Sequence, residues 1–141
     1  MQIEASRELV ATPDDVWALL AEPRHLSDWW PGYRSIQPDR RGLAAGARWQ
    51  VARSGRAGLI RRPGGTGLIV LTELEPGSLL AWHDVQQGFA ATIRIEAEDV
   101  HTRAQLTLEA PWWRLRVEGL SHAPREALAR LHALCQTAAT V

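Results

Sequence analysis

Between Gly67 and Ala110 the side chains alternate between apolar and polar with a period of two, and this pattern constrains the fold more than any other feature. Three runs show it, at Leu68-Val70-Thr72-Leu74, Ala91-Ile93-Ile95-Ala97 and Ala104-Leu106-Leu108-Ala110. Such a period predicts strands with one buried and one solvent-facing side, because successive strand residues point to opposite faces. Residues Leu79 to Val85 supply a further strand between the first two runs.

The connections between these strands are short and turn-like. They contain Pro76-Gly77, Gln87-Gly88 and Asp99-Val100-His101. A parallel crossover needs a dozen or more residues, so short turns require neighbouring strands to be antiparallel. The stretch therefore predicts a four-stranded antiparallel meander whose apolar face must be covered by another element.

The C-terminal segment has the pattern of an amphipathic helix that could cover this face. Its apolar residues recur at intervals of three and four and form one stripe, made of Ala127, Leu128, Leu131, Leu134, Cys135 and Ala138. Pro124 suits the first helical position, where its missing N–H would be unpaired in any case. We therefore expect a long closing helix from Pro124 onward.

The N-terminal third adds strands and two short helices. Residues Ile3 to Val10 alternate as a first strand, and Thr12 then caps a helix that begins at Pro13. A second short helix is expected from Arg24 to Trp30, followed by strands at Tyr33 to Pro38 and Ala47 to Arg53. The expected order is one strand, two helices, six more strands and a long helix.

Two segments do not have a unique interpretation. Residues 54–66 are rich in Gly and Arg and favour a hairpin tip; a phosphate-cradling loop is disfavoured because no Lys-Ser/Thr follows. Residues 111–123 include Trp112-Trp113-Arg114-Leu115-Arg116-Val117, which alternates like a strand. Its position before Pro124 favours an irregular or helical approach to the closing helix.

Composition narrows the function classes. Sixteen arginines with no lysine balance sixteen acidic residues, so the net charge is zero and a strongly basic nucleic-acid-binding protein is disfavoured. No apolar run reaches the roughly 18 residues of a membrane span, so we expect a cytoplasmic protein without membrane insertion. Residues 1–141 should form one domain. The single cysteine, Cys135, is interpreted as a small buried hydrophobe, and the histidines lack metal-ligand spacing.

The order of elements, together with several short motifs, resembles the START-like or Bet v 1-like superfamily, which includes the polyketide cyclase/dehydrase family. The motifs are Ile3-Glu4-Ala5-Ser6, Thr12-Pro13-Asp14-Asp15-Val16-Trp17-Ala18-Leu19-Leu20, Leu26-Ser27-Asp28-Trp29-Trp30-Pro31, Glu73-Leu74-Glu75-Pro76-Gly77-Ser78-Leu79-Leu80-Ala81-Trp82 and Leu128-Ala129-Arg130-Leu131. The resemblance spans the whole chain, and each motif is structural.

The resemblance implies an α+β helix-grip fold, in which a curved seven-stranded antiparallel sheet (β-α-α-β6-α) wraps around the C-terminal helix. It also implies a cavity between sheet and helix that holds a small hydrophobic or aromatic molecule, such as a lipid, steroid or polyketide. Two other functions stay open. One is a polyketide cyclase/dehydratase-type enzyme, and the other is a co-chaperone-like or regulator-like interaction module. Because one fold serves many functions, function must be argued from the site.

Seven tryptophans suggest which residues could line such a cavity. The expected lining residues, chosen from inward-facing strand positions and from the approach to the closing helix, are Trp49, Val70, Thr72, Trp82, Ile93, Leu106 and Trp112. Core packing explains Trp49 and Trp82 equally well. Exposure of Trp112 or its neighbour Trp113 would suit the mouth of the cavity.

The polar candidates are Arg53, which shares a strand face with Trp49, and Asp84, which shares one with Trp82. Either could anchor a ligand, and in the enzyme alternative both would be catalytic. A carboxylate inside an apolar cavity can act as a general acid or base, whereas a carboxylate at the end of a strand is more commonly in water. No cofactor is expected, the expected partner is a small hydrophobic molecule, and a homodimer stays open.

Overall fold

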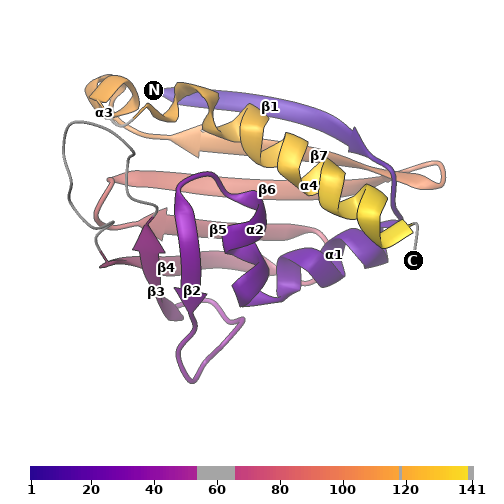
Figure 1. Ribbon diagram of the computed structural model, residues 1–141, viewed down its shortest axis with the longest axis horizontal. Coiled ribbons are helices and arrows are strands. Elements are labelled where there is room, and N and C mark those ends of the chain that lie inside the picture. Colours follow the sequence, from indigo (N-terminus) through magenta and orange to yellow (C-terminus); the bar gives the residue numbers. More distant parts are fainter. Residues whose placement is uncertain (54–65, 118, 140–141) are drawn as a thin grey trace.

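The computed structural model describes residues 1–53, 66–117 and 119–139 (Figure 1). The strands are β1 (Gln2–Leu9), β2 (Tyr33–Gln37), β3 (Arg48–Arg53), β4 (Thr66–Glu75), β5 (Leu79–Asp84), β6 (Phe89–Glu98) and β7 (His101–Glu109). The helices are α1 (Pro13–Ala21), α2 (Leu26–Trp29), α3 (Trp112–Val117) and α4 (Ala123–Ala139), with 3-10 turns η1 (Pro23–His25) and η2 (Leu120–His122). The segment 54–65, where a hairpin tip or a phosphate loop was considered, lies outside the described residues.

All seven strands belong to one antiparallel sheet, in the order β1-β7-β6-β5-β4-β3-β2. Strands β4 to β7 are consecutive neighbours and form the predicted meander. Strand β1 pairs with β7 and forms the edge of the sheet on that side, where Ile3 lies opposite Leu108. The N-terminal strand and the last strand are therefore adjacent in space although they are distant in sequence.

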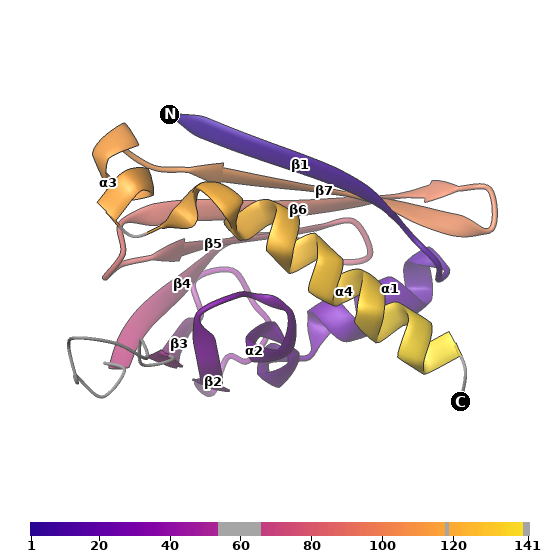
Figure 2. The same ribbon diagram turned by 45° about the horizontal axis from the view of Figure 1, so that its top comes forward.

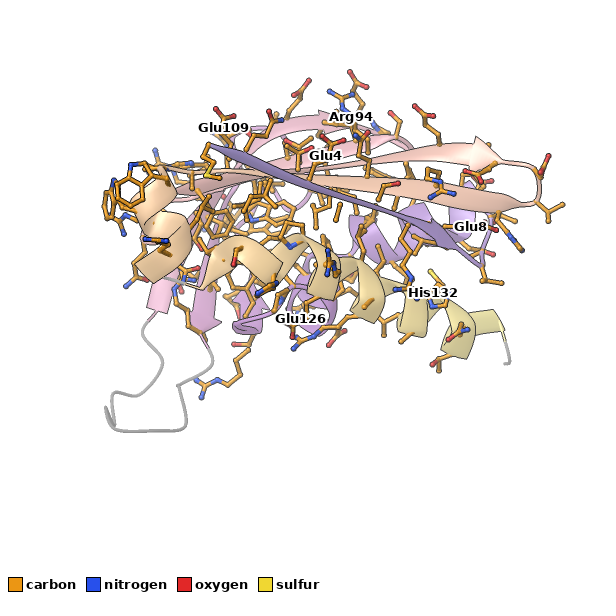
Figure 3. All side chains as sticks on the ribbon, turned by 90° about the horizontal axis from the view of Figure 1, so that it is seen from above. Glu4, Glu8, Arg94, Glu109, Glu126 and His132 are labelled. Atoms are coloured by element: carbon orange, nitrogen blue, oxygen red, sulfur yellow. The ribbon has the colours of Figure 1, made fainter. Side chains whose placement is uncertain are left out.

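Helix α4 crosses one face of the sheet diagonally, and α1 and α2 lie on the same side (Figures 1 and 2). The buried positions of α4 include Ala127, Leu128, Leu131 and Cys135, as its apolar stripe predicted. On the opposite face of the sheet, Glu4, Arg94 and Glu109 point away from α4 (Figure 3). The predicted helix-grip arrangement of a sheet around a C-terminal helix is confirmed. No helix in the described part of the chain is long and apolar enough to span a bilayer.

Helix α1 begins as its sequence indicates. The Thr12 backbone is extended just before the helix, and the Thr12 hydroxyl oxygen accepts a hydrogen bond from the Asp15 backbone N–H at 3.3 Å. Pro13 follows at the first helical position. A backbone N–H there would have no partner within the helix, so the N–H that proline lacks costs no hydrogen bond. This cap directs α1 across the end of the sheet, so that Val16 and Leu20 become buried against the core.

The predicted orientation of β4 is wrong over its first half. Ile69 and Leu71 are 0% and 1% exposed, whereas Val70 is half-buried and Thr72 is exposed. A register shift in the pairing with β5 falls between Leu71 and Glu73, and such a bulge adds one residue to one strand. The extra residue reverses the alternation, and Leu74 again packs against the core. Residues 68–71 are all apolar, so their sequence does not select a face.

The segment after β7 is helical, which confirms the favoured interpretation of residues 111–117. Pro111 precedes α3, and its carbonyl accepts hydrogen bonds from the backbone N–H groups of Arg114 and Leu115. Leu115 is 4% exposed and packs toward the core, whereas Trp112 and Trp113 are 62% and 46% exposed. A helix this short presents one residue inward and leaves the two indole rings in solvent.

Candidate functional site

The structure brings the two polar candidates together. Arg53 ends β3 and Asp84 ends β5, and the Arg53 Nη2 group donates to both Asp84 oxygens, at 2.6 and 2.7 Å. Tyr33, the first residue of β2, donates its hydroxyl to Asp84 Oδ2 at 2.7 Å. The Asp84 side chain is fully buried and that of Arg53 is 12% exposed, so the three groups form a polar cluster at one end of the core.

Further contacts fix the geometry of this cluster. The backbone N–H of Gln87 donates to Asp84 Oδ1 at 2.8 Å, and Arg53 Nε donates to the Gln86 side-chain oxygen at 3.1 Å. Gly67 of β4 leaves the necessary space, because a Cβ there would lie 2.6 Å from Gln86 Oε1 and 2.9 Å from Arg53 Nη2. The turn after β5 and the glycine of β4 therefore hold the guanidinium against the carboxylate.

The surroundings of Tyr33 keep its hydroxyl protonated. Burial is the main cause that raises the pKa of Tyr33 well above 10.0, and the negative charge of Asp84 and the hydrogen bond to it add to the effect. The indole N–H of Trp82 and the positive charge of Arg53 act in the opposite direction and are weaker. Tyr33 is therefore a neutral hydrogen-bond donor at physiological pH, beside a carboxylate and a guanidinium.

Aromatic rings fill the core next to the polar cluster. Trp30 stacks on Phe89 with ring centroids 5.5 Å apart, and its ring meets that of Trp82 edge-on at 5.2 Å. Trp29 packs edge-on against Trp82 at 5.8 Å, and Tyr33 lies 6.0 Å from Trp30. These geometries are those that the quadrupoles of aromatic rings favour. Five rings from α2 and its C-cap, β2, β5 and β6 thus form one continuous cluster.

Two indole N–H groups in this core have no hydrogen-bond partner among the described residues. They belong to Trp29 and Trp82, and both rings are at most 1% exposed. The Trp82 N–H lies close enough to the Tyr33 oxygen to affect its pKa, but it does not meet hydrogen-bond geometry. By contrast, Trp49 donates its indole N–H to the Gly42 carbonyl at 2.8 Å. Buried donors usually have partners, so these two are exceptional.

The structure places only some of the predicted lining residues in the core. Four lie in the core with 0% exposure, namely Trp49, Trp82, Ile93 and Leu106. The prediction that Val70 and Thr72 point inward is wrong, because the bulge in β4 changes which residues of the strand face the core. Trp112 lies on α3 outside the core. A ligand contact at the four core residues stays a prediction.

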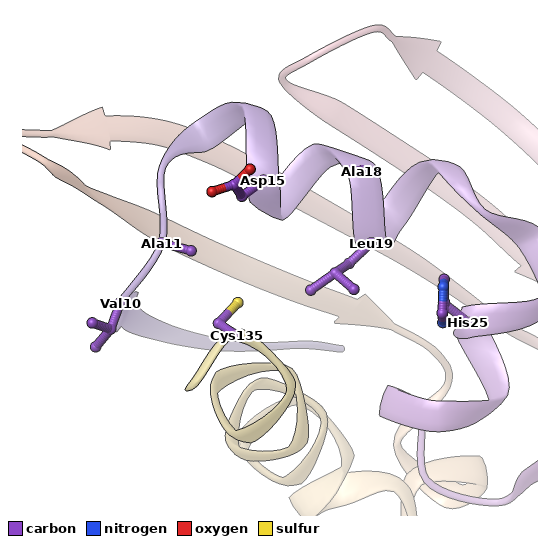
Figure 4. Close-up of a pocket in the computed structure, with 7 residues that line it drawn as sticks. All are labelled: Val10, Ala11, Asp15, Ala18, Leu19, His25 and Cys135. Atoms are coloured by element: carbon purple, nitrogen blue, oxygen red, sulfur yellow. The ribbon is translucent and has the colours of Figure 1, made fainter. Parts of the chain in front are cut away.

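A cavity of about 380 Å³ lies elsewhere, between α1 and the C-terminal half of α4 (Figure 4). It is lined by Val10, Ala11, Asp15, Ala18, Leu19, His25 and Cys135. Two smaller cavities, of about 220 and 60 Å³, lie between β1 and the start of α4. None of these three cavities includes a residue that was predicted as lining.

Sequence reasoning missed several members of the polar cluster. Tyr33, Gly67, Gln86 and Gln87 received no functional role, although Tyr33 is the only tyrosine of the chain. Its position at the start of a strand was correct, but no sequence spacing links it to Asp84. The sequence offers Arg53 and Asp84 as alternative polar anchors for a ligand, and the structure joins them in one ion pair.

Comparison with known proteins identifies the family. A family model described as polyketide cyclase / dehydrase and lipid transport matches residues 1–136. A protein from Nitrosomonas europaea has a crystal structure with a TM-score of 0.75 and 20% identity, covering 97% of this chain and 95% of its own.

Two further crystal structures show the same fold. A protein from Mesorhizobium loti has a TM-score of 0.75 and 15% identity, and covers 97% of this chain and 98% of its own. A protein from Chromobacterium violaceum has a TM-score of 0.71 and 19% identity, with 95% and 96% covered. No curated protein matches the chain. With nearly its whole length matched, the chain belongs to the polyketide cyclase / dehydrase and lipid transport family.

Proposed function

We propose that the protein binds a small hydrophobic or aromatic molecule between the sheet and α4, and that the cluster of Tyr33, Arg53 and Asp84 anchors a polar group of this ligand. The family description, with its polyketide and lipid substrates, supports such a ligand. The observation that carries the proposal is the buried ion pair at the end of an aromatic core. Binding pockets combine apolar walls with a few convergent polar groups in this way.

Stability alone is a weak reason for this ion pair. Apolar residues of the same volume commonly stabilise a core as well as a buried ion pair does, because desolvation of the charges offsets their attraction. The N–H of Trp29, which has no partner among the described residues, points to the same conclusion, since a buried donor without a partner costs about 1–3 kcal/mol. A ligand oxygen among the aromatic rings would offset this cost. The ligand class that fits is therefore apolar with at least one hydrogen-bond acceptor.

Ligand binding can be measured by tryptophan fluorescence with a panel of aromatic hydrocarbons, phenols and carboxylic acids. Native mass spectrometry of freshly purified protein would detect a copurified ligand. The variant Arg53→Met/Asp84→Leu removes both charges together, so that neither is left buried and unpaired. We expect it to weaken binding of the polar ligands by at least about tenfold, since a hydrogen bond to a charged group contributes about 1.5 kcal/mol or more. Binding of hydrocarbons should persist.

The matched control is Ala18→Phe, which places a ring in the cavity between α1 and α4. We expect this variant to bind the panel like the unmodified protein. Loss of binding in Ala18→Phe, with full binding in the charge-free variant, would place the ligand in the α1–α4 cavity and contradict the proposed site. Absence of binding for the whole panel, with nothing copurified, would contradict the function.

A second candidate, a cyclase- or dehydratase-type enzyme, is favoured by one observation. The Tyr33 hydroxyl and the Asp84 carboxylate share a hydrogen bond of 2.7 Å, which places a protonated phenol beside a base. In that case Tyr33→Phe would retain ligand binding and lose turnover of a polyketide-like substrate. Full turnover in Tyr33→Phe and in Asp84→Asn would exclude these side chains as the acid and base.

A further inference from the structure

The outer surface of α3 combines apolar and cationic side chains. Trp112 and Trp113 are 62% and 46% exposed, although large apolar side chains are normally buried. Leu115 of the same helix is 4% exposed and anchors α3 to the core. Met1, which is 71% exposed, accepts a backbone hydrogen bond from Ala110 and so lies beside the start of the helix. The exposed residues Met1, Trp112 and Trp113, together with the arginines of the helix, form what we call the α3 surface.

Arginines flank both indole rings. Arg116 is exposed and lies three residues from Trp113 and four from Trp112, which places all three side chains on one face of the helix. The Arg114 guanidinium lies over the Trp113 ring, 4.7 Å from its centroid. Helix α3 contains no acidic residue, although the chain as a whole has no net charge. The side chains of the helix itself therefore carry positive charge only, although Glu109 and Glu118 flank α3 in the sequence.

The α3 surface lies at one end of the molecule. In two views α3 lies after the end of β7, next to the N-terminus and at the end of the molecule opposite the β6–β7 turn (Figures 1 and 2). A short helix that projects in this way offers a small convex contact. Stable protein–protein contacts generally need about 800 Å² on each partner, arranged around a buried centre.

We propose that the α3 surface docks on a lipid bilayer that contains anionic lipids. Tryptophan favours the interface between headgroups and acyl chains, where its ring is buried and its N–H remains hydrated. Arginine beside it pairs with the lipid phosphates, and exposed apolar rings combined with basic residues are the signature of helices that lie on membranes. Trp112 and Trp113 enter the interfacial layer, and Arg116 contacts the headgroups.

This docking goes beyond the proposed ligand binding and does not rest on it. The α3 surface is nevertheless connected to the polar cluster, because Arg114 Nη1 donates to the Gln86 carbonyl at 3.5 Å and the Gln86 side chain accepts from Arg53. When the protein is docked, the end of its core that contains the polar cluster would therefore lie next to the bilayer.

Cosedimentation with vesicles tests the docking directly. One set of vesicles contains phosphatidylcholine and phosphatidylglycerol in equal amounts, and the other contains phosphatidylcholine alone. We expect binding to the anionic set, with weakening as salt is added. The variant Trp112→Ser/Trp113→Ser should lose at least about tenfold in affinity, because it removes the buried apolar area. Arg116→Gln should lose about fivefold on anionic vesicles only, the effect expected for one basic residue near a charged membrane.

The matched control is Val100→Ser, which changes an apolar side chain that is 74% exposed at the far end of the sheet. It should bind vesicles like the unmodified protein, and circular dichroism should show that every variant is folded. The proposal is overturned if the unmodified protein does not bind anionic vesicles, or if the double tryptophan variant binds them equally well. It is also overturned if sedimentation velocity shows that the tryptophans hold a stable homodimer in solution.

Discussion

Arg53 of β3 and Asp84 of β5 form a buried ion pair across the intervening strand β4, with Arg53 Nη2 2.6 and 2.7 Å from the two carboxylate oxygens. The pair spans β4 at Gly67, the one position of that strand without a side chain in the described residues. Three strands must therefore assemble before either charge has its partner. This relationship underlies the proposed site and the first three predictions below.

Removing one partner of the ion pair should strongly destabilise the fold. Asp84→Leu leaves the Arg53 guanidinium largely buried without its carboxylate, and we expect the free energy of unfolding in urea to fall by about 3 kcal/mol. The double variant Arg53→Met/Asp84→Leu should be clearly more stable than Asp84→Leu. As a control, Glu98→Gln disrupts the exposed pair with Arg103 and should change stability little. An Asp84→Leu variant as stable as the control would contradict the structural role of the pair.

Tyr33 should resist ionisation in the folded protein. Burial and the Asp84 charge raise its pKa well above 10.0, so the folded state favours the protonated phenol. Its contribution to stability is complete below the unfolded pKa and is lost as pH rises toward the folded pKa. Because Tyr33 is the only tyrosine, the ultraviolet absorbance of tyrosinate reports this group alone. We expect the absorbance to rise together with unfolding seen by circular dichroism.

The comparison for this titration is Tyr33→Phe, which lacks the ionising group. Raising the pH should therefore no longer destabilise this variant through ionisation of Tyr33. At neutral pH the variant should be less stable by about 1.5 kcal/mol or more, because it lacks the hydrogen bond to the Asp84 carboxylate. Tyrosinate that forms near its usual pKa while the protein stays folded would show that the hydroxyl is not buried beside the carboxylate.

A side chain at Gly67 should disturb the cluster through crowding. In Gly67→Ala the new Cβ would lie 2.6 Å from Gln86 Oε1 and 2.9 Å from Arg53 Nη2, so these two side chains must shift. Both atoms end flexible side chains, and we expect a loss of about 1 kcal/mol in urea unfolding. The same change in a Gln86→Ala background should cost less, because the closest atom is absent. Equal costs in the two backgrounds would show that Gln86 is not the crowded group.

Cys135 should be unreactive until the protein unfolds. It is 1% exposed, and burial, followed by the Asp15 carboxylate, raises the pKa of its thiol to about 11. The thiolate is the reactive form, so at about pH 8 a disulfide reagent should modify Cys135 far more slowly in the folded protein than in urea. Asp15→Asn should increase the rate slightly. Rapid modification of the folded protein would mean that the cavity between α1 and α4 gives reagents access to the sulfur.

The local patterns of the sequence were sufficient to predict most of the fold. The alternation in residues 91–110 and the short turns beside it predicted antiparallel neighbours, and the structure pairs Ile93 with Leu106 in this way. The apolar stripe around Leu131 predicted the closing helix, and Thr12 predicted the start of α1. These features depend on side chains two to four residues apart, which one element brings together by its own geometry.

The site depended on contacts that no local pattern encodes. Arg53, Asp84 and Tyr33 lie on three strands, and their meeting follows from the sheet order and from the space at Gly67. The same is true of the orientation of Val70 and Thr72, which a bulge in the pairing with β5 reverses. Residue types and periods in the sequence therefore determined which elements form and which faces are apolar. Only the packed sheet decided which charges are buried together, because that depends on register between strands far apart in the chain.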